Sequence, residues 1–100
     1  MPNQYEIVWK GCLEIIKDNV NEKSFTTWFE PIKPVALENN VLTIQVPSQF
    51  FYEWLEEHYV TLLRKTIKRE LGADARLEYR IIVEKSGGKQ SIVNYPNYNS

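Results

Sequence analysis

Apolar side chains recur every three or four residues near the start of the chain, from about residue 4 to residue 19, with charged residues between them. This spacing is typical of a helix that buries one face, so an amphipathic first helix is predicted over this stretch. A second, shorter helix is predicted to hold Phe29 and to stop before Pro31, which discourages helix in the residue before it. Either Asn21 or Ser24 can cap this helix, and the sequence does not choose between them.

The periodicity changes to alternation between Pro31 and Pro47, which predicts two short strands. Asn39-Asn40 separates them and suits a two-residue turn, because asparagine tolerates the positive φ angles of tight hairpins. Pairing across this turn gathers apolar side chains on one face, and a slip of one residue would scatter them. Pro34 cannot donate to a ladder, so we expect the first strand to lie at an edge. The predicted opposite pairs are Leu37 with Leu42, Val35 with Ile44 and Lys33 with Val46.

A long third helix is predicted from about Gln49 to Leu71, because apolar residues recur through it at helical spacing. Ser48 can accept hydrogen bonds from the N–H groups of its first turn, and Gly72 is a suitable stop. Phe50 lies beside the apolar stripe rather than in it, so it is free to serve either the core or a partner.

Alternating apolar and polar residues from residue 77 to residue 84 predict a third strand. The element order is therefore helix, helix, strand, strand, helix, strand, which indicates an α+β domain. The simplest way to bury such a small sheet is to pack helices on one face of three largely antiparallel strands. Glycine, serine and asparagine dominate from residue 85, so we expect one domain over residues 1–84 and a flexible tail over residues 85–100.

The composition describes an ordinary globular chain of one small domain, with 43% hydrophobic and 25% charged residues among 100. Its formal net charge of -1 gives no strong attraction of the whole molecule to nucleic acid or to anionic membranes. The single cysteine, Cys12, excludes an internal disulfide, and no signal-peptide or membrane-spanning pattern is present. We therefore expect a cytoplasmic protein.

The sequence offers little for catalysis. Cys12 lies on the apolar stripe of the first helix and is expected to be a small buried hydrophobe. His58 has no second histidine at metal-ligand spacing, and no glycine-rich phosphate loop precedes a helix. We therefore expect no enzyme activity, no metal and no cofactor in this domain.

Four cations, Arg64, Lys65, Lys68 and Arg69, lie close together near the end of the third helix. Their ordinary interpretation is a solvated helix end, because nearby acidic residues almost cancel the charge. The alternative is a patch that contacts the phosphates of single-stranded DNA.

Three tryptophans, six tyrosines and four phenylalanines are too many for full burial in so small a core. Aromatic side chains are favoured anchors of protein interfaces, so some are expected to form a contact surface. Trp9 can belong either to the core or to a self-association surface. Phe50 favours a surface role, whereas Trp28 is expected to pack inside with an exposed edge.

The chain resembles the N-terminal domain of the bacterial replication initiator DnaA. The resemblance runs in order, with the family's spacing, from about residue 5 to residue 84, and the tail is similar to the start of that family's variable linker. It implies a compact domain similar to a K-homology fold. The segments that carry it are Val8–Leu13, Ser24–Pro31, Asn40–Pro47 and Phe50–Leu55.

The resemblance also implies a role without catalysis, in which the domain self-associates weakly and contacts the replicative helicase and initiation regulators at the chromosomal origin. Complete members of the family bind ATP in another domain. The self-association residue that the family implies is Trp9, with Val8 and Cys12 beside it. The residues implied for the helicase and the regulators are Ser24, Thr27, Trp28, Ser48, Phe50 and Phe51.

One departure from the family pattern and one difference from K-homology domains narrow these expectations. Some members carry a functional glutamate where this chain has Ser24, so we do not expect an ion pair there, whereas a hydroxyl contact stays open. The glycine-rich clamp with which K-homology domains grip a nucleic-acid backbone is missing, which argues against strong sequence-specific binding. A weak K-homology-like single-stranded DNA-binding module remains the alternative function, with Arg64, Lys65, Lys68 and Arg69 as its contacts.

Overall fold

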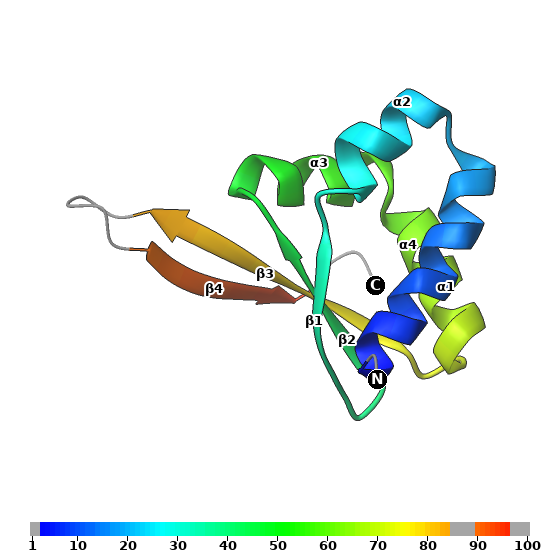
Figure 1. Ribbon diagram of the computed structural model, residues 1–100. Helices are drawn as coiled ribbons and strands as arrows, with labels where there is room; N and C mark the ends of the chain where they lie inside the picture. The colour runs from blue at the N-terminus through cyan, green and yellow to red at the C-terminus, as the bar shows by residue number, and fades with distance from the viewer. Residues whose placement is uncertain (1–2, 85–89, 97–100) are drawn as a thin grey trace.

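The computed structural model describes the backbone over residues 3–84 and 90–96 and the side chains over residues 3–81. Three helical segments come before the first strand, two helices connect the second strand to the third, and a pair of strands ends the described chain (Figure 1). The elements are α1 (Gln4–Asn19), α2 (Glu22–Ser24), the π-helical segment η1 (Phe25–Phe29), β1 (Lys33–Glu38), β2 (Val41–Val46), α3 (Gln49–His58), α4 (Val60–Leu71), β3 (Arg76–Glu84) and β4 (Gln90–Pro96).

The strands form one mixed sheet in the order β1-β2-β3-β4. β1 pairs with β2 and β3 with β4 in antiparallel fashion, while β2 and β3 are parallel. Parallel neighbours require a long crossover, which α3 and α4 provide. The helices gather on one side of the sheet, and the β3–β4 ribbon reaches away from them (Figure 1). The predicted α+β class is confirmed. Two of the three strand pairs are antiparallel, as expected, but the central pair, β2 with β3, is parallel.

A strand, β4, lies within the stretch that we expected to be a flexible tail. It pairs with β3 in a register that sets Ile81 opposite Val93 and Glu84 opposite Gln90, so the sheet gains a strand beyond the three predicted. The short apolar run at 92 and 93 is flanked by serine and asparagine and carries little strand signal without its partner. The rest of the predicted tail, residues 85–89 and 97–100, lies outside the described residues. The division of the chain after residue 84 stays a prediction.

The first two helices begin and end close to where the pattern places them. α1 covers Gln4–Asn19, as predicted. Asn21 rather than Ser24 caps the second helix, because its side chain accepts a hydrogen bond from the Ser24 N–H at 2.7 Å. After that first turn the helix widens into the π-helical η1.

The predicted third helix is divided at Tyr59 into α3 and α4. Tyr59 has φ -128° and ψ 3°, which is not helical, although the Tyr59 N–H still bonds to the Leu55 carbonyl at 2.9 Å. Its ring lies edge-on to Phe29 at 5.1 Å, so packing against η1 accompanies the break. No glycine or proline marks the position, which is why the sequence pattern reads through it.

The β1–β2 hairpin has the predicted turn and part of the predicted register. Asn39 and Asn40 have φ angles of 50° and 64°, as a two-residue hairpin turn requires. Leu37 lies opposite Leu42 as expected. A bulge between Pro34 and Ala36 then shifts the ladder, so the predicted pairing of Val35 with Ile44 is wrong. Pro34, which lacks an N–H, lies opposite Ile44 instead, and Lys33 lies opposite Gln45 rather than Val46.

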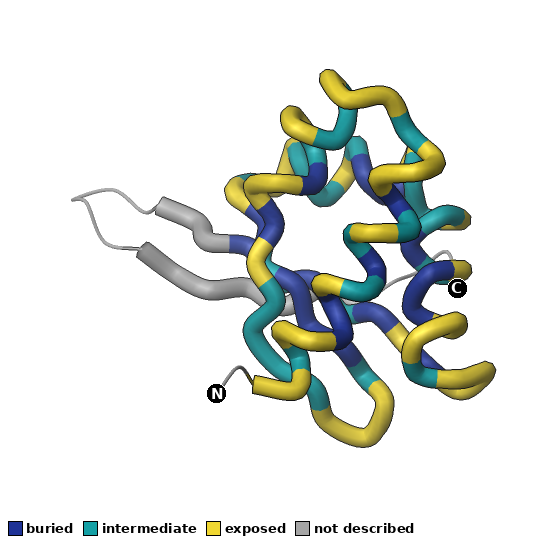
Figure 2. Tube along the Cα trace, turned by 45° about the vertical axis from the view of Figure 1, so that its right-hand side comes forward, coloured by how far each residue is buried: buried dark blue, intermediate teal, exposed yellow. Residues whose placement is uncertain are grey.

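The hydrophobic core fills the space between the helices and the sheet (Figure 2). One face of β2 and β3 supplies its floor, and α1, η1, α3 and α4 cover it. The hydrophobic side chains of the core that are 0% exposed are Cys12, Ile16, Phe29, Leu42, Ile44, Leu55, Leu63, Tyr79 and Ile81.

A buried polar pair ties α3 to the sheet. The hydroxyl of Tyr79, which is fully buried, donates a hydrogen bond of 2.8 Å to the Glu56 carboxylate, which is 9% exposed. Burial, reinforced by that carboxylate, raises the pKa of Tyr79 far above its ordinary value, so the hydroxyl keeps its proton. The ring of Tyr52 packs edge-on against Tyr79 at 5.0 Å.

We expect Tyr79→Phe to lower the free energy of unfolding by about 1–3 kcal/mol, because it removes a donor from a buried carboxylate without opening a large cavity. Urea denaturation followed by circular dichroism measures the change. Tyr59→Phe is the matched control, since the Tyr59 hydroxyl has no hydrogen-bond partner in the described structure. Equal losses from the two variants would show that the Glu56 bond contributes nothing specific.

Candidate functional site

Aromatic side chains from η1 and α3 meet on one side of the molecule. We call Trp28, Phe50, Phe51, Trp54 and His58 the aromatic surface. Residues 50, 54 and 58 are four apart, so they follow one another along a single face of α3. Ser48 sets the start of that helix by accepting a hydrogen bond from the Phe51 N–H at 3.2 Å. The cap at Ser48 therefore fixes where Phe50 and Phe51 enter the surface.

The π-helical turn brings Trp28 to α3. The Glu30 N–H bonds to the Phe25 carbonyl at 3.1 Å, the five-residue step of a π-helix. Such turns are rare and occur frequently at functional sites. Stacking of Phe25 on Phe29, with ring centroids 6.2 Å apart, accompanies the turn.

Trp28 is the centre of the aromatic surface. Its indole stacks almost parallel on Trp54, with centroids 4.8 Å apart and planes 9° apart. Phe51 lies 4.9 Å and Phe50 6.0 Å from the same ring. His58 continues the row at 4.1 Å from Trp54. These contacts make a continuous layer rather than five separate rings.

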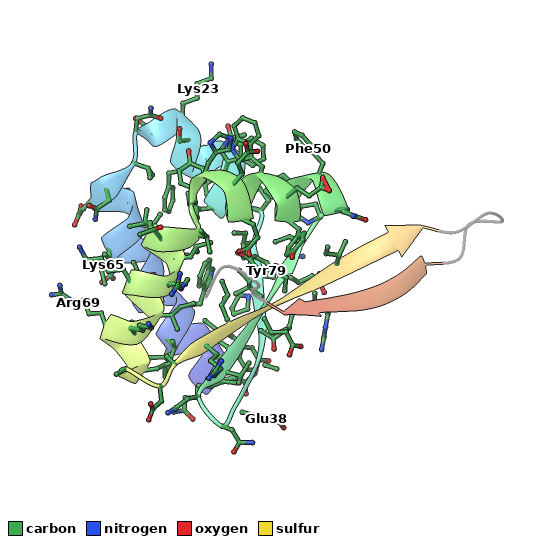
Figure 3. The ribbon with its side chains drawn as sticks, turned by 180° about the vertical axis from the view of Figure 1, so that it is seen from behind. Lys23, Glu38, Phe50, Lys65, Arg69 and Tyr79 are labelled. Carbon is green, nitrogen blue, oxygen red and sulfur yellow. The ribbon has the colours of Figure 1, made fainter. Side chains whose placement is uncertain are left out.

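Phe50 is the member of this layer that solvent reaches. It is 61% exposed, whereas Trp28, Phe51 and Trp54 are half-buried. Figure 3 shows its side chain standing on the outer side of α3. Phe51 packs against the core and Leu55 is fully buried, so the core closes without Phe50, as the sequence predicted.

Acidic side chains flank the exposed ring. Glu53 and Glu57 follow Phe50 by three and seven residues, on the same side of α3, and both are exposed. Glu57 approaches His58, with its carboxylate 3.8 Å from Nε2. This side of α3 therefore presents an exposed apolar ring next to two carboxylates.

Ser24 and Thr27, the other residues that we expected at this site, lie on α2 and η1. Thr27 is exposed, whereas Ser24 is half-buried and its N–H is occupied by Asn21. The structure thus brings Trp28, Phe50 and Phe51 into direct ring contact and places Thr27 on the segment beside them.

The residues expected for self-association are buried. Val8, Trp9 and Cys12 are 8%, 2% and 0% exposed, so none presents a side chain to a second copy in this fold. The structure decides the open alternative for Trp9 in favour of the core. Ile7, the neighbouring residue on α1, is 58% exposed and faces solvent instead. The signal in the sequence is the position of Ile7 just outside the apolar stripe of the first helix.

The four cations form two pairs that are offset by about 100° around α4. Arg64 and Lys68 line a recess together with Arg76 of β3. Lys65 and Arg69 are exposed and project away from the sheet (Figure 3). The sequence could not bring Arg76 into this group, because Arg76 comes eight positions after Lys68, beyond the end of the helix and a turn.

Among the described residues, no group of three or more histidine, cysteine, aspartate or glutamate side chains could hold a metal ion. None of the described helices is both long and apolar enough to cross a membrane.

The fold defines a small α+β domain built on a parallel β-α-α-β unit, and the helical segments α1, α2 and η1 and the edge strand β1 come before that unit. The chain belongs to the DnaA N-terminal domain family, which matches residues 6–69.

Its relatives are proteins named chromosomal replication initiator protein DnaA. The one from Flavobacterium psychrophilum is 56% identical over 85% of this chain and 18% of its own length. The one from Bacteroides thetaiotaomicron is 46% identical over 92% of this chain and 20% of its own length. The one from Thermus thermophilus is 38% identical over 78% of this chain and 18% of its own length. This chain therefore spans no more than about a fifth of these relatives.

The thiol of Cys12 offers a test of the packing between α1 and α4. Burial raises the pKa of Cys12 from its ordinary 9.0 to about 11. We expect iodoacetamide at pH 8 to modify the folded chain at least about 10³-fold more slowly than the chain in denaturant, because reaction requires unfolding. Mass spectrometry of timed samples measures the rate.

The raised pKa of Cys12 also makes the free energy of unfolding decrease at alkaline pH. A thiol whose folded pKa exceeds its unfolded pKa stabilises the fold fully below pH 9 and loses that contribution as the pH rises towards 11. Cys12→Ala should reduce this alkaline loss. Rapid alkylation of the native chain at pH 8 would mean that α1 is not packed as described.

Proposed function

We propose that this chain is a non-catalytic interaction module of a bacterial replication initiator. It recruits the replicative helicase and initiation regulators to the chromosomal origin and helps initiators to associate weakly, in the cytoplasm. Family membership supports the setting. The observation that carries the proposal is Phe50, a large apolar side chain left 61% exposed at the edge of an aromatic layer.

The aromatic surface has the features of a hot spot for protein binding. Phe50 retains most of its surface for a partner, and Trp28 and Trp54 hold it from behind at about 6 Å between ring centroids. A ring that is already positioned loses little side-chain entropy on binding, and buried aromatic anchors dominate interface energies. These features support this surface as the contact for the helicase or a regulator, with Thr27, Phe51 and the Ser48 cap at its margin.

The charges around Phe50 specify the chemistry of the partner. Glu53 and Glu57 would be desolvated by an apolar partner without cations, which is unfavourable. A partner surface with an apolar pocket rimmed by lysine or arginine satisfies both groups. Binding should accordingly weaken as salt rises.

Self-association is assigned to the outer side of α1 at Ile7, because Val8, Trp9 and Cys12 are buried. A single exposed aliphatic side chain gains little against the entropy lost on association, so the dimer is weak. The first turns of α1 and α3 lie at opposite ends of the molecule (Figures 1 and 3), so the two contacts do not compete.

We expect Phe50→Ala to weaken binding of the replicative helicase by at least about tenfold, because it removes the exposed anchor and leaves the core intact. Surface plasmon resonance with the immobilised chain measures the affinity, and circular dichroism checks the fold. Ile7→Ala is the matched control, an exposed apolar side chain on another helix, and it should bind the helicase as the unmodified chain does. Full binding by the Phe50 variant would remove this residue from the site.

For self-association we expect the opposite pattern, in which Ile7→Ala weakens the dimer and Phe50→Ala does not. Sedimentation at high concentration is expected to show less dimer for Ile7→Ala and an unchanged amount for Phe50→Ala. Trp9→Ala is unsuitable for this purpose, because deleting a buried indole costs about 3–5 kcal/mol of folding stability. If Ile7→Asp, a harsher change on the same surface, also left the dimer intact, α1 would not be the interface.

A further inference from the structure

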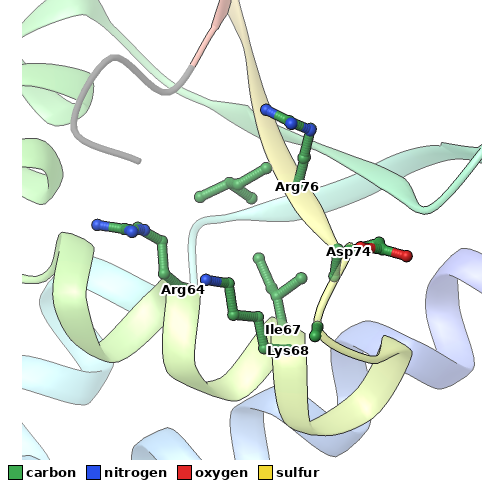
Figure 4. Close-up of a pocket in the computed structure, with 8 residues that line it drawn as sticks. Arg64, Ile67, Lys68, Asp74 and Arg76 are labelled. Carbon is green, nitrogen blue, oxygen red and sulfur yellow. The ribbon is translucent and has the colours of Figure 1, made fainter.

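A recess lies where the end of α4 turns into β3, away from the aromatic surface (Figure 4). Its volume is about 520 Å³, which is enough for a small ligand or a few residues of a peptide. The residues that line it are Arg64, Ile67, Lys68, Ala73, Asp74, Ala75, Arg76 and Leu77.

Three cations face this recess from two elements. Arg64 and Lys68 are one turn apart on α4, and Arg76 is the first residue of β3. In Figure 4 all three side chains extend towards the same side of the recess, while the carboxylate of Asp74 points away from them. Neither Lys68 nor Arg76 takes part in an ion pair within the described structure. Both charges are therefore available to a bound anion.

The side chains have to supply the whole attraction for such an anion. Lys68 lies in the last turn of α4, and the carbonyl end of a helix repels negative charge. The formal net charge of -1 gives the chain no general attraction for anions either. An anionic ligand must therefore contact the cations directly, so the removal of one cation should weaken binding measurably.

Buried aliphatic side chains form the base of the recess. Ile67, Ala75 and Leu77 line it and are 1%, 7% and 5% exposed. An apolar base excludes water from one side of an ion pair, which strengthens the attraction between the two charges. The ligand that suits this site carries anionic groups beside one aliphatic group.

The lining distinguishes an acidic peptide from a nucleic acid. Sites for single strands combine a cationic groove with aromatic side chains on which bases stack. None of the described residues that line this recess is aromatic, and the next aromatic residue on β3, Tyr79, is fully buried. Asp74 lies in the wall and Glu70 is exposed in the last turn of α4, so a strand that left the recess past either residue would bring phosphates near carboxylates. A short acidic peptide needs neither stacking nor a long path, and arginine binds carboxylates through paired hydrogen bonds.

We propose that this recess binds a short acidic segment of a partner protein. Its carboxylates contact Arg64, Lys68 and Arg76, and one aliphatic side chain lies on the base between them. Clusters of arginine recognise acidic motifs in other proteins in the same way. This partner is opposite in charge to the one proposed for the aromatic surface. The inference does not depend on that proposal, which uses other residues.

NMR titration of the whole 100-residue chain with the peptide acetyl-Glu-Glu-Leu-Glu-Glu-amide tests the site. The backbone signals of Ala75 and Leu77 are expected to shift. A peptide in which glutamine replaces every glutamate should cause no shifts, because it carries no charge. A peptide in which serine replaces the leucine should bind about threefold more weakly, because it buries less apolar area.

Variants of the protein identify the contacts. Lys68→Gln and Arg76→Gln should each weaken binding of the peptide about fivefold at ~0.05 M salt, because each removes a charge-assisted hydrogen bond. Lys65→Gln and Arg69→Gln are matched controls, which remove the same charge from exposed positions of α4 outside the lining and should leave the affinity unchanged (Figure 3). Asp74→Asn should strengthen binding about twofold, a gain that damage to the fold cannot mimic.

Four outcomes would overturn the inference. The first is the absence of shifts at Ala75 and Leu77. Equal losses from the Lys65 and Lys68 variants would indicate diffuse attraction to α4, and equal shifts with the glutamine peptide would show that carboxylates are not recognised. An oligothymidylate that shifted the same signals at a lower concentration than the peptide would assign the recess to nucleic acid. Phe50→Ala should bind the peptide normally, so a failure at the recess is distinguishable from a failure of the helicase contact.

Discussion

The hydrogen bond from the Tyr79 hydroxyl to the Glu56 carboxylate decides how α3 is turned on the sheet, and the rest of the site depends on that rotation. Tyr52 and Glu56 are four residues apart and both contact Tyr79, so this face of α3 points inward. Residues two positions away lie on the far side of a helix with 3.6 residues per turn. Phe50, Trp54 and His58 must therefore face away from the sheet, where Trp28 meets the first two.

Burying a carboxylate in this position has a cost that an apolar residue would not incur. An apolar residue at 56 would also be compatible with several rotations of α3, whereas the Glu56–Tyr79 bond is compatible with one. The break at Tyr59 adds to this effect, because α4 begins in a new direction and packs on α1 without turning α3 with it. The orientation of Glu53 and Glu57 on α3 is therefore independent of the orientation of the basic recess beside α4, although the two helices follow each other directly in the chain.

The sequence predicted the elements that local chemistry determines. The apolar period of α1, the asparagine turn at 39–40 and the cap at Ser48 each act within a few residues, and each is found where expected. Long-range packing decided the rest. The ladder between β1 and β2 shifts beside Pro34, which lacks an N–H. The break at Tyr59 accompanies its contact with Phe29, and β4 is defined by its pairing with β3. In the candidate site, the exposure of Phe50 was predictable because this residue lies outside the apolar stripe of its helix. The burial of Trp9 was not, because both of its alternatives satisfy the same helical spacing.

The parallel β2-α3-α4-β3 unit places the two candidate surfaces at the start of the first helix and the end of the second. Lys68 lies in the last turn of α4, where the helix dipole favours a cation, whereas the glutamates of α3 lie beyond the first turn of that helix and gain no such stabilisation. Because the charges nearly cancel over the whole chain, neither surface is visible in the net charge of -1. A partner that binds the exposed ring of Phe50 leaves Lys68 and Arg76 accessible. A single domain of this size therefore presents an exposed aromatic ring with acidic neighbours at one end of the helical pair and a basic recess at the other.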